Sequence, residues 1–208
     1  GSAWQFTWYV PHDVKSLINL IGERQFIDRL NAGFATSEKV SFNALGDNMG
    51  AYPINHGNET NMQAAYLFSY TSEPWPTQKW ARAIQEKYYG MGPRDAYPGD
   101  EDQGQMSSWY ILSSIGLFQM DGGCSKDPVW LLGSPRFDRV EILLDNTYYS
   151  GKKLIIKAEN VSKDNCYIQY VRFNNKRLSN NYIEWSKLKK GGTLHFIMGD
   201  QPNPNAFK

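Results

Sequence analysis

Three consecutive carboxylates, Asp100, Glu101 and Asp102, are the residues of this chain whose type and spacing point most directly to chemistry. Like charges this close repel, so a chain tolerates them when a cation lies among them, when they share a proton, or when the loop is well solvated. Two carboxyl groups can also hydrolyse a glycosidic bond, one as acid to the leaving oxygen and one as base to a water. Because Asp100 and Asp102 are only two residues apart, they are poorly placed to straddle a sugar. They could instead hold and deprotonate one water together.

A second polar constellation, His56-Gly57-Asn58-Glu59-Thr60-Asn61, precedes a predicted helix. Hard divalent cations prefer carboxylate and amide oxygens of the kind that Asn58 and Glu59 carry. The alternative is that Asn58 or Thr60 simply caps the helix. With three His and two Cys in the chain there are too few ligands for a typical zinc site, so the two polar loops together favour calcium. We interpret His12-Asp13, the third candidate, as a capping pair at a helix start.

Helical periodicity surrounds both loops. Apolar residues predict two helices separated by Gly22, from about residue 13 to 30, which would form an αα-hairpin. Further helices are predicted over residues 62–70, over 77–89 with Thr77 as N-cap, and over 106–115. The acidic loop therefore enters the last of these helices.

Beyond residue 128 the pattern changes to alternation. Short β-branched or aromatic runs predict strands, which we expect to pair in an antiparallel sheet, at residues 140–144, 154–158, 167–173, 182–185 and 193–198. Helices followed by strands predict an α+β fold. We expect a helical region at residues 1–127 and a C-terminal antiparallel β region at 128–208.

Composition narrows the function classes. The chain has 208 residues, of which 41% are hydrophobic and 14% aromatic, so it can bury a core and still line a sugar site with flat rings. A net charge of +1 with dispersed Lys and Arg argues against nucleic acid as a partner. No stretch is long and apolar enough to predict a membrane span. Cys124 and Cys166 exclude a disulfide-dense scaffold, and whether these two cysteines pair stays open.

Five motifs in consistent order resemble the C-terminal part of the family 92 glycoside hydrolases, which are calcium-dependent, inverting, exo-acting α-mannosidases. The resemblance covers essentially the whole chain, and its motifs are Ala3–Asp13 (AWQFTWYVPHD), His56–Glu59 (HGNE), Gly99–Tyr110 (GDEDQGQMSSWY), Gly133–Asp138 (GSPRFD), and Phe196–Gly199 (FIMG) followed by Pro202-Asn203.

The resemblance implies roles for individual residues. Asp102 would be the general base and Asp100 would help to position the water, while His56, Glu59 and Trp4 would contact sugar. Asn58 and Glu59 would lie on the loop that binds Ca²⁺, which would hold two vicinal mannose hydroxyls. The helices would then be part of an (α/α)6 toroid, and the protein would be an exported, bacterial-type enzyme, secreted or periplasmic, that removes terminal α-mannose from glycans such as N-glycans.

Two departures from the family pattern shape these expectations. The family's general acid is a glutamate expected just before the first motif, and here that motif follows Gly1-Ser2. We therefore expect this chain to be a piece of a longer protein, to need the missing N-terminal part as a partner, and to be inactive alone. Gly57 stands where members that cut α-1,2 links are expected to carry an acidic residue, so the linkage stays open.

Two other function classes fit the same residues. A non-catalytic, calcium-dependent carbohydrate-binding module would use the aromatic rings and the acidic loop without hydrolysis. In a purely structural interpretation the carboxylates are solvated helix caps. A hydrolase requires Asp102 beside room for a water and a sugar, whereas a binding module requires a stacked aromatic platform.

Overall fold

A computed structural model describes residues 1–45, 50–97 and 101–208 of the chain. Its contacts divide the chain into two compact units, Gly1–Ile111 and Leu112–Lys208. The division falls inside helix α6 (Gln105–Ser114). The domain boundary predicted between residues 127 and 128, where the helical period gives way to alternation, stays a prediction.

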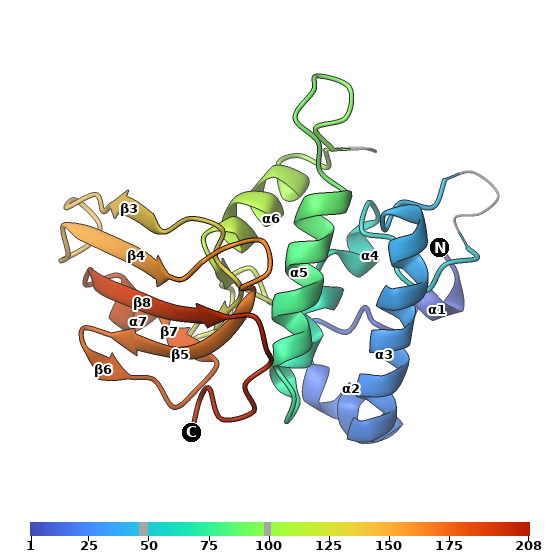
Figure 1. Cartoon of the computed structure of the whole chain (residues 1–208), viewed down its shortest axis with the longest axis horizontal. Helices are drawn as coiled ribbons and strands as arrows, with labels where there is room; N and C mark the ends of the chain where they lie inside the picture. Colours follow the sequence, from blue (N-terminus) through green and yellow to red (C-terminus); the bar gives the residue numbers. More distant parts are fainter. Residues whose placement is uncertain (46–49, 98–100) are drawn as a thin grey trace. The chain divides into compact units, whose positions relative to one another are not determined.

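The first unit is helical in its described part (Figure 1). Its α-helices are α1 (Ala3–Phe6), α2 (Val14–Ile21), α3 (Glu23–Ser37), α4 (Glu59–Met62), α5 (Trp75–Lys87) and the first part of α6, with 3₁₀ helices η1 (Glu38–Val40) and η3 (Ala64–Tyr70). The predicted helical pair is confirmed, because α2 and α3 are separated only by Gly22, which has φ 86° and ψ 128°. Asp13 caps α2, since its carboxylate accepts a hydrogen bond from the Ser16 N–H at 3.1 Å.

A helix is found over most of residues 62–70, as predicted, but it is not a continuous α-helix with one apolar face. The segment η3 is a 3₁₀ helix, and Ala64 to Ser69 are buried on every side. A one-faced apolar stripe was inferred from spacing alone, but the neighbouring elements enclose this short segment completely, so no face of it needs to be polar.

Thr77 is not the N-cap of the next helix. Helix α5 begins at Trp75 with Pro74 in the capping position and Pro76 in the first turn, where a missing N–H costs nothing. Thr77 is buried inside the helix, where its hydroxyl lies 3.2 Å from the hydroxyl of Ser69.

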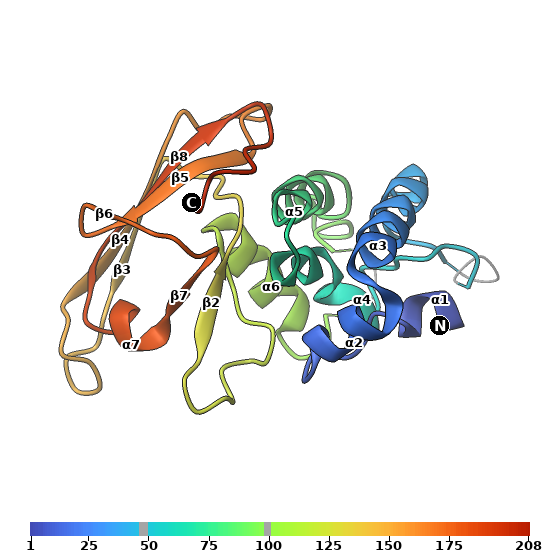
Figure 2. The same ribbon diagram turned by 90° about the horizontal axis from the view of Figure 1, so that it is seen from below.

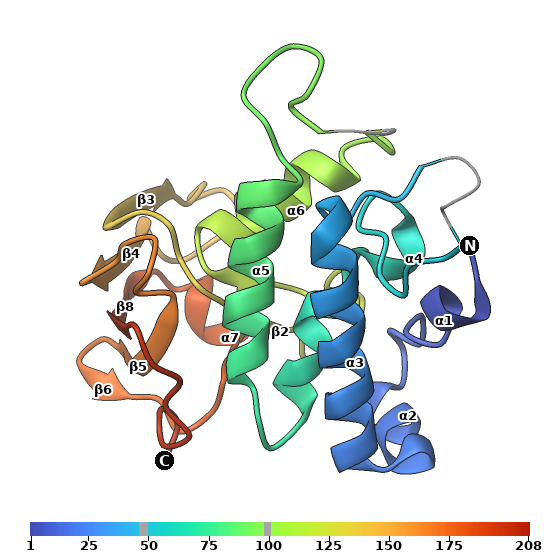
Figure 3. The same cartoon turned by 45° about the vertical axis from the view of Figure 1, so that its right-hand side comes forward.

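Aromatic packing joins α3 to α5, which run side by side (Figure 3). Phe34 of α3 stacks on Trp80 of α5 with ring centroids 5.3 Å apart, and Phe68 of η3 packs against the same Phe34. The Trp80 indole N–H donates to the Asn31 side chain at 2.8 Å. This core holds the middle of α5, and after the end of that helix the chain continues into the candidate site.

The second unit contains two sheets in its described residues. Strands β1 (Leu117–Phe118), β2 (Val129–Leu132) and β7 (Tyr182–Glu184) form a three-stranded antiparallel sheet, and β7 leads into the short helix α7 (Trp185–Leu188), as Figure 2 shows. The other sheet has the order β3-β4-β8-β5-β6 and consists of β3 (Arg139–Leu143), β4 (Lys153–Glu159), β5 (Tyr167–Phe173), β6 (Lys176–Arg177) and β8 (Gly192–Gly199).

The prediction of a purely antiparallel sheet is wrong for one pair. Strands β4 and β8 run parallel, with Ile156 opposite Leu194, while the other pairs in both sheets are antiparallel. Alternation shows which face of a strand is buried but carries no information on its direction. The long connection from β4 through β5, β6 and β7 lets β8 enter between β4 and β5 in the direction that β4 already has.

A separate apolar core holds the second unit together. The inward residues of β4, β5 and β8 meet in it, including Ile156, Val171, Leu194 and Phe196, none of which is exposed. Cys124 and Cys166 are both free thiols. The fold is thus a mixture of helices and sheets, as predicted, and no helix in residues 1–45, 50–97 or 101–208 is long and apolar enough to cross a membrane.

Candidate functional site

The acidic loop is tied to the start of α6 by Glu101. Its carboxylate accepts hydrogen bonds from the Gly104 N–H, from the Ser107 N–H at 3.3 Å and from the Ser107 hydroxyl at 2.8 Å. The Ser107 hydroxyl is the main reason that the pKa of Glu101 lies below its usual value. Glu101 therefore acts as a cap for the exposed N–H groups of α6, and for this carboxylate the capping interpretation is correct.

Asp102 has an unusual backbone. Its φ is 56°, that of Gln103 is 58° and that of Gly104 is 96°, so three consecutive residues lie in the left-handed region. For residues with a side chain this conformation costs about 1–2 kcal/mol each and often marks a functional site. Asp102 is partly buried, whereas Asp100 lies outside the described residues.

His56 is completely buried, and its Nε2 lies 2.9 Å from the hydroxyl of Tyr89. Since the Tyr89 hydroxyl donates its proton to the Met106 carbonyl at 3.1 Å, His56 Nε2 must carry the hydrogen and donate to Tyr89. Among the described residues, His56 Nδ1 has no hydrogen-bond partner. The two hydrogen bonds that link His56, Tyr89 and Met106 thus hold the first turn of α6, directly after the loop that carries Asp102.

Aromatic rings enclose His56. Trp109 lies edge-on at a centroid distance of 4.3 Å and Tyr88 at 4.9 Å, while Tyr89 and Trp109 stack nearly parallel, 5.8 Å apart. Burial in this cage lowers the pKa of His56 from 6.5 to about 3, so the ring is neutral at physiological pH. A neutral, enclosed imidazole is suited to a positioning role, through its hydrogen bond to Tyr89 and its packing against Tyr88 and Trp109.

The two polar loops meet through a pair of tyrosines at the end of α5. Burial raises the pKa of the Tyr88 hydroxyl, and the negative charge of Asp102 raises it further. The pKa of Tyr89 is raised by burial first, then by Tyr88, Tyr110 and the charge of Glu101. Because both tyrosines also touch His56, the structure brings the acidic loop close to the loop of residues 56–61.

Asn58 and Glu59 begin helix α4. Asn58 occupies the N-cap position without a side-chain capping hydrogen bond, and Glu59 is exposed in the first turn. The capping explanation for the Asn58 side chain is therefore not supported. The two side chains offer hard oxygen donors that fit calcium, but no group of three His, Cys, Asp or Glu side chains that could hold a metal occurs in the described residues. Asn58 and Glu59 alone are too few to hold such a cation, which takes about six to eight oxygen ligands.

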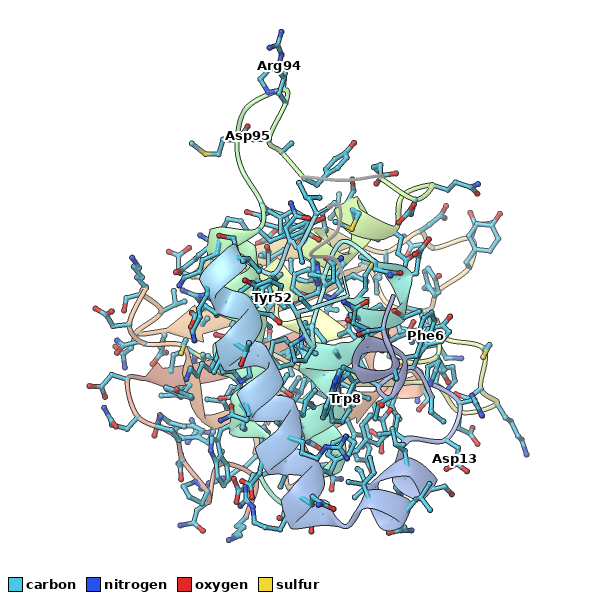
Figure 4. The ribbon with its side chains drawn as sticks, turned by 90° about the vertical axis from the view of Figure 1, so that its right-hand side faces the viewer. Phe6, Trp8, Asp13, Tyr52, Arg94 and Asp95 are labelled. Atoms are coloured by element: carbon cyan, nitrogen blue, oxygen red, sulfur yellow. The ribbon has the colours of Figure 1, made fainter. Side chains whose placement is uncertain are left out.

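Trp4 lies on the short helix α1 and is 56% exposed. The Arg29 guanidinium lies over its ring, 5.4 Å from the centroid. In Figure 4, which labels its neighbours Phe6 and Trp8, this N-terminal segment faces the viewer. Trp4 presents an aromatic face, and no contact in the described structure joins it to the acidic loop.

A hollow of about 310 Å³ lies beside Tyr89. Three tyrosine rings, those of Tyr89, Tyr97 and Tyr110, line it together with Ser107, and further lining comes from Gly90, Ala96 and Ile111. Ser107 is the residue whose hydroxyl binds Glu101. The hollow is large enough for one ring-shaped ligand and lies against the residues that hold the acidic loop.

Sequence reasoning placed Asn61 in the second polar loop but missed the buried amide network to which it belongs. Buried amides join the N-terminal segment to the second loop: Asn61 donates to the Gln5 carbonyl at 2.9 Å and accepts from the Asn55 N–H at 2.9 Å, while Gln63 donates to the Trp8 carbonyl at 3.2 Å. Tyr89 was also missed, and Tyr88 was assigned only to a helical stripe. The closely spaced amides Asn55, Asn61 and Gln63 were the signal that could have indicated a buried network.

Comparison with known proteins identifies the class to which this site belongs. The glycosyl hydrolase family 92 catalytic domain matches residues 1–200. An uncharacterized secreted glycosidase from Arthroderma benhamiae is 29% identical over 201 residues, which are 95% of this chain and 23% of that protein.

Solved structures agree with this assignment. The family GH92 α-mannosidase BT3965 from Bacteroides thetaiotaomicron, in complex with mannoimidazole, is 33% identical with a TM-score of 0.83 over 99% of this chain and 26% of its own. The inverting family GH92 mannosidase BT2199 from Bacteroides thetaiotaomicron VPI-5482 is 31% identical with a TM-score of 0.81 over 100% of this chain and 28% of its own. The chain therefore belongs to glycosyl hydrolase family 92, and it spans 23–28% of the length of these relatives.

Proposed function

We propose that this chain is the C-terminal part of the catalytic region of an inverting exo-α-mannosidase that acts on terminal α-mannosides of glycans. The observation that carries the proposal is the strained, braced loop that holds Asp102 beside buried Tyr88, in a chain that matches a family 92 catalytic domain. The names of its relatives support mannose as the sugar and hydrolysis with inversion as the reaction. The helices of residues 1–127 would be the last part of an (α/α)6 toroid.

Asp102 would act as the general base. Its carboxylate would take a proton from a water as the water oxygen bonds to the anomeric carbon and the bond to the leaving oxygen breaks. Asp100 would help to hold that water, and an acid from outside this chain would protonate the leaving oxygen. The partly buried position of Asp102 would limit competing solvent, and its fixed backbone would keep the carboxylate aimed.

Glu59 and Trp4 would contact the sugar directly, through the exposed carboxylate of Glu59 and the exposed ring of Trp4. His56 would act differently from the expectation of direct contact. Since its ring is fully buried and donates to Tyr89, it would serve the sugar site by holding Tyr89 and the first turn of α6.

Asn58 and Glu59 would supply two oxygen ligands of a calcium site, and the remaining ligands would come from backbone carbonyls, water, substrate or the rest of the protein. Bound calcium would stabilise charge and orient two sugar hydroxyls. The uncapped Asn58 side chain is the feature of the structure that supports this assignment. We further propose that the enzyme is exported, secreted or periplasmic, and of bacterial type, and that N-glycans are among its substrates; the secreted relative supports export.

The test is the change Asp102→Asn in the longer protein that carries this chain. Release of mannose from α-mannobiosides should fall about 10²–10⁴-fold, because the amide cannot accept the proton from water. In the same assay a calcium chelator should lower the activity of the unmodified enzyme, and added calcium should restore it. The matched control is Asp28→Asn, which changes an exposed carboxylate paired with Arg24 and should leave the rate unchanged.

A rate for Asp102→Asn within a few-fold of the unmodified enzyme would contradict the assignment of the base. If the longer protein binds mannosides in a calcium-dependent way but releases no mannose, the alternative of a non-catalytic carbohydrate-binding module would replace the proposal.

A further inference from the structure

A second hollow, of about 360 Å³, lies in the unit of residues 112–208, and its lining includes none of the residues proposed for hydrolysis. One wall is the segment of residues 126–128, and the other comes from the end of β7 and helix α7, with Trp185 at its start. Figure 2 shows β2 and β7 side by side with α7 following β7.

Backbone bonds hold the two walls together. The Trp185 N–H donates to the Pro128 carbonyl at 2.9 Å, and directly beside this bond Val129 of β2 pairs with Glu184 of β7. The lining residues therefore keep their spacing without a ligand, so binding would need little ordering of the backbone.

Trp185 provides a pre-positioned aromatic surface. Its ring lies 6.2 Å from that of Trp130 at an angle of 54°, and the edge of Tyr149 meets it at 5.5 Å and 85°. Two aromatic neighbours restrict the rotation of the indole, and Trp185 still lines the hollow. A fixed indole with polar groups around it is suited to the apolar face of a sugar ring, whose hydroxyls reach outward to the rim.

The charges on the rim are unequal. Glu184 is neutralised by Lys187, whose ammonium lies 2.7 Å from its carboxylate. Lys126 and Lys189 are exposed and form no ion pair within the part of the chain that the structure describes, and the same holds for Asp127. Two available ammonium groups against one carboxylate favour a ligand with a single negative charge.

We propose that this hollow binds a pyranose ring that carries one anionic substituent, such as a uronic acid unit of a glycan. The ring lies on Trp185, the anionic group is held by Lys126 and Lys189, and Asp127 accepts hydrogen bonds from hydroxyls. A volume of about 360 Å³ suits one ring, since small-molecule sites range from about 300 to 1,000 Å³. The site is independent of the proposed mannosidase activity.

The experiment is a titration of the ¹⁵N-labelled chain, followed by NMR at the Trp185 indole N–H, which the variant Trp185→Phe assigns. Methyl β-D-glucuronide should shift this signal in a saturable way, and the affinity should fall as salt is added. Methyl β-D-glucoside, the matched neutral ligand, should bind more weakly. Lys126→Gln and Lys189→Gln should each weaken glucuronide binding about 1.5- to 5-fold, as expected for exposed ion pairs.

Lys163→Gln is the control, because Lys163 is an exposed lysine in the same unit that does not line the hollow. The backbone spectrum of each variant checks that it is folded, and Trp185→Phe should still bind, more weakly. Equal binding of the glucoside, tighter binding of adenosine monophosphate than of the glucuronide, or an unchanged indole signal at saturating glucuronide would each overturn the proposal.

Discussion

At the scale of single residues, the candidate site combines a strained backbone at Asp102 and Gln103 with a fully buried His56. Asp102 and Gln103 keep left-handed backbones because their neighbours hold both sides of the turn. On one side Glu101 binds Ser107 and its carbonyl accepts the Met106 N–H, and on the other His56 and Tyr89 hold the Met106 carbonyl. A backbone conformation that costs free energy persists only when several surrounding interactions fix it. The hydrogen bonds on both sides of Asp102 and Gln103 provide such interactions.

The buried His56 predicts a specific dependence of stability on pH. Its pKa is about 3 in the folded chain and 6.5 when exposed, so between these values the unfolded chain binds more protons. The free energy of unfolding must then rise with pH in this window, and the contribution of His56 is lost as pH falls below 6.5. The slope from this residue approaches about 1.4 kcal/mol per pH unit.

Denaturant unfolding at several values between pH 5 and 7 measures that slope. His56→Gln should remove it, while His12→Gln, which changes an exposed histidine, should keep it. If His56→Gln does not fold, NMR of the unmodified chain gives the answer, because the His56 ring signals should not titrate above pH 5. Titration of His56 near pH 6.5 in the folded chain would contradict the burial described here.

At the scale of elements, the one-residue connection between α2 and α3 depends on the backbone conformation of Gly22. Gly22 joins α2 to α3 with φ 86° and ψ 128°, a region that residues with a side chain rarely adopt, and a Cβ added there would meet no atom within 4 Å. A substitution at this position therefore tests backbone strain without a steric clash.

Gly22→Ala should lower the free energy of unfolding by about 1–3 kcal/mol, measured by denaturant unfolding. Gly22→Asn should not rescue it, because asparagine tolerates the left-handed helical region, where ψ is much smaller. The control is Gly50→Ala, where the nearest neighbour of an added Cβ is the Cβ of Ser2 at 3.8 Å, an ordinary contact distance, so the change should be close to neutral. A neutral effect of Gly22→Ala would show that the connection relaxes at little cost.

At the scale of the whole molecule, the chain spans about a quarter of the length of its relatives and exposes large aromatic residues near its start. Trp4, Phe6 and Tyr9 are 56%, 52% and 48% exposed. We predict that the 208-residue chain alone releases no mannose from a mannobioside, because in our proposal the general acid would come from the rest of the longer protein.

The measurement compares the chain with the longer protein at equal concentration, after a cooperative unfolding transition has shown that the chain is folded. The prediction fails if the chain alone releases mannose and Asp102→Asn abolishes that release. In that case the acid must lie within these 208 residues.

Local patterns in the sequence were sufficient for much of the secondary structure. The pairing of α2 with α3, the Asp13 cap, the helices at the positions of α5 and α6, and strands β3, β4, β5, β7 and β8 follow from periodicity and turn residues, because these signals lie within a few residues of one another. The family motifs were readable for the same reason. The short strands β1, β2 and β6 were not predicted. The 3₁₀ form of η3 and the start of α5 were not, since neighbouring elements and two prolines decided them.

The sequence by itself thus determined the family, the mixture of helices and strands, and the presence of two polar loops. Only the tertiary structure decided that β8 runs parallel to β4, that His56 is enclosed by aromatic rings, and that Glu101 caps a helix while Asp102 adopts a strained turn. The physical reason is that strand direction, burial and hydrogen-bond partners depend on residues distant in the chain, which no local pattern records.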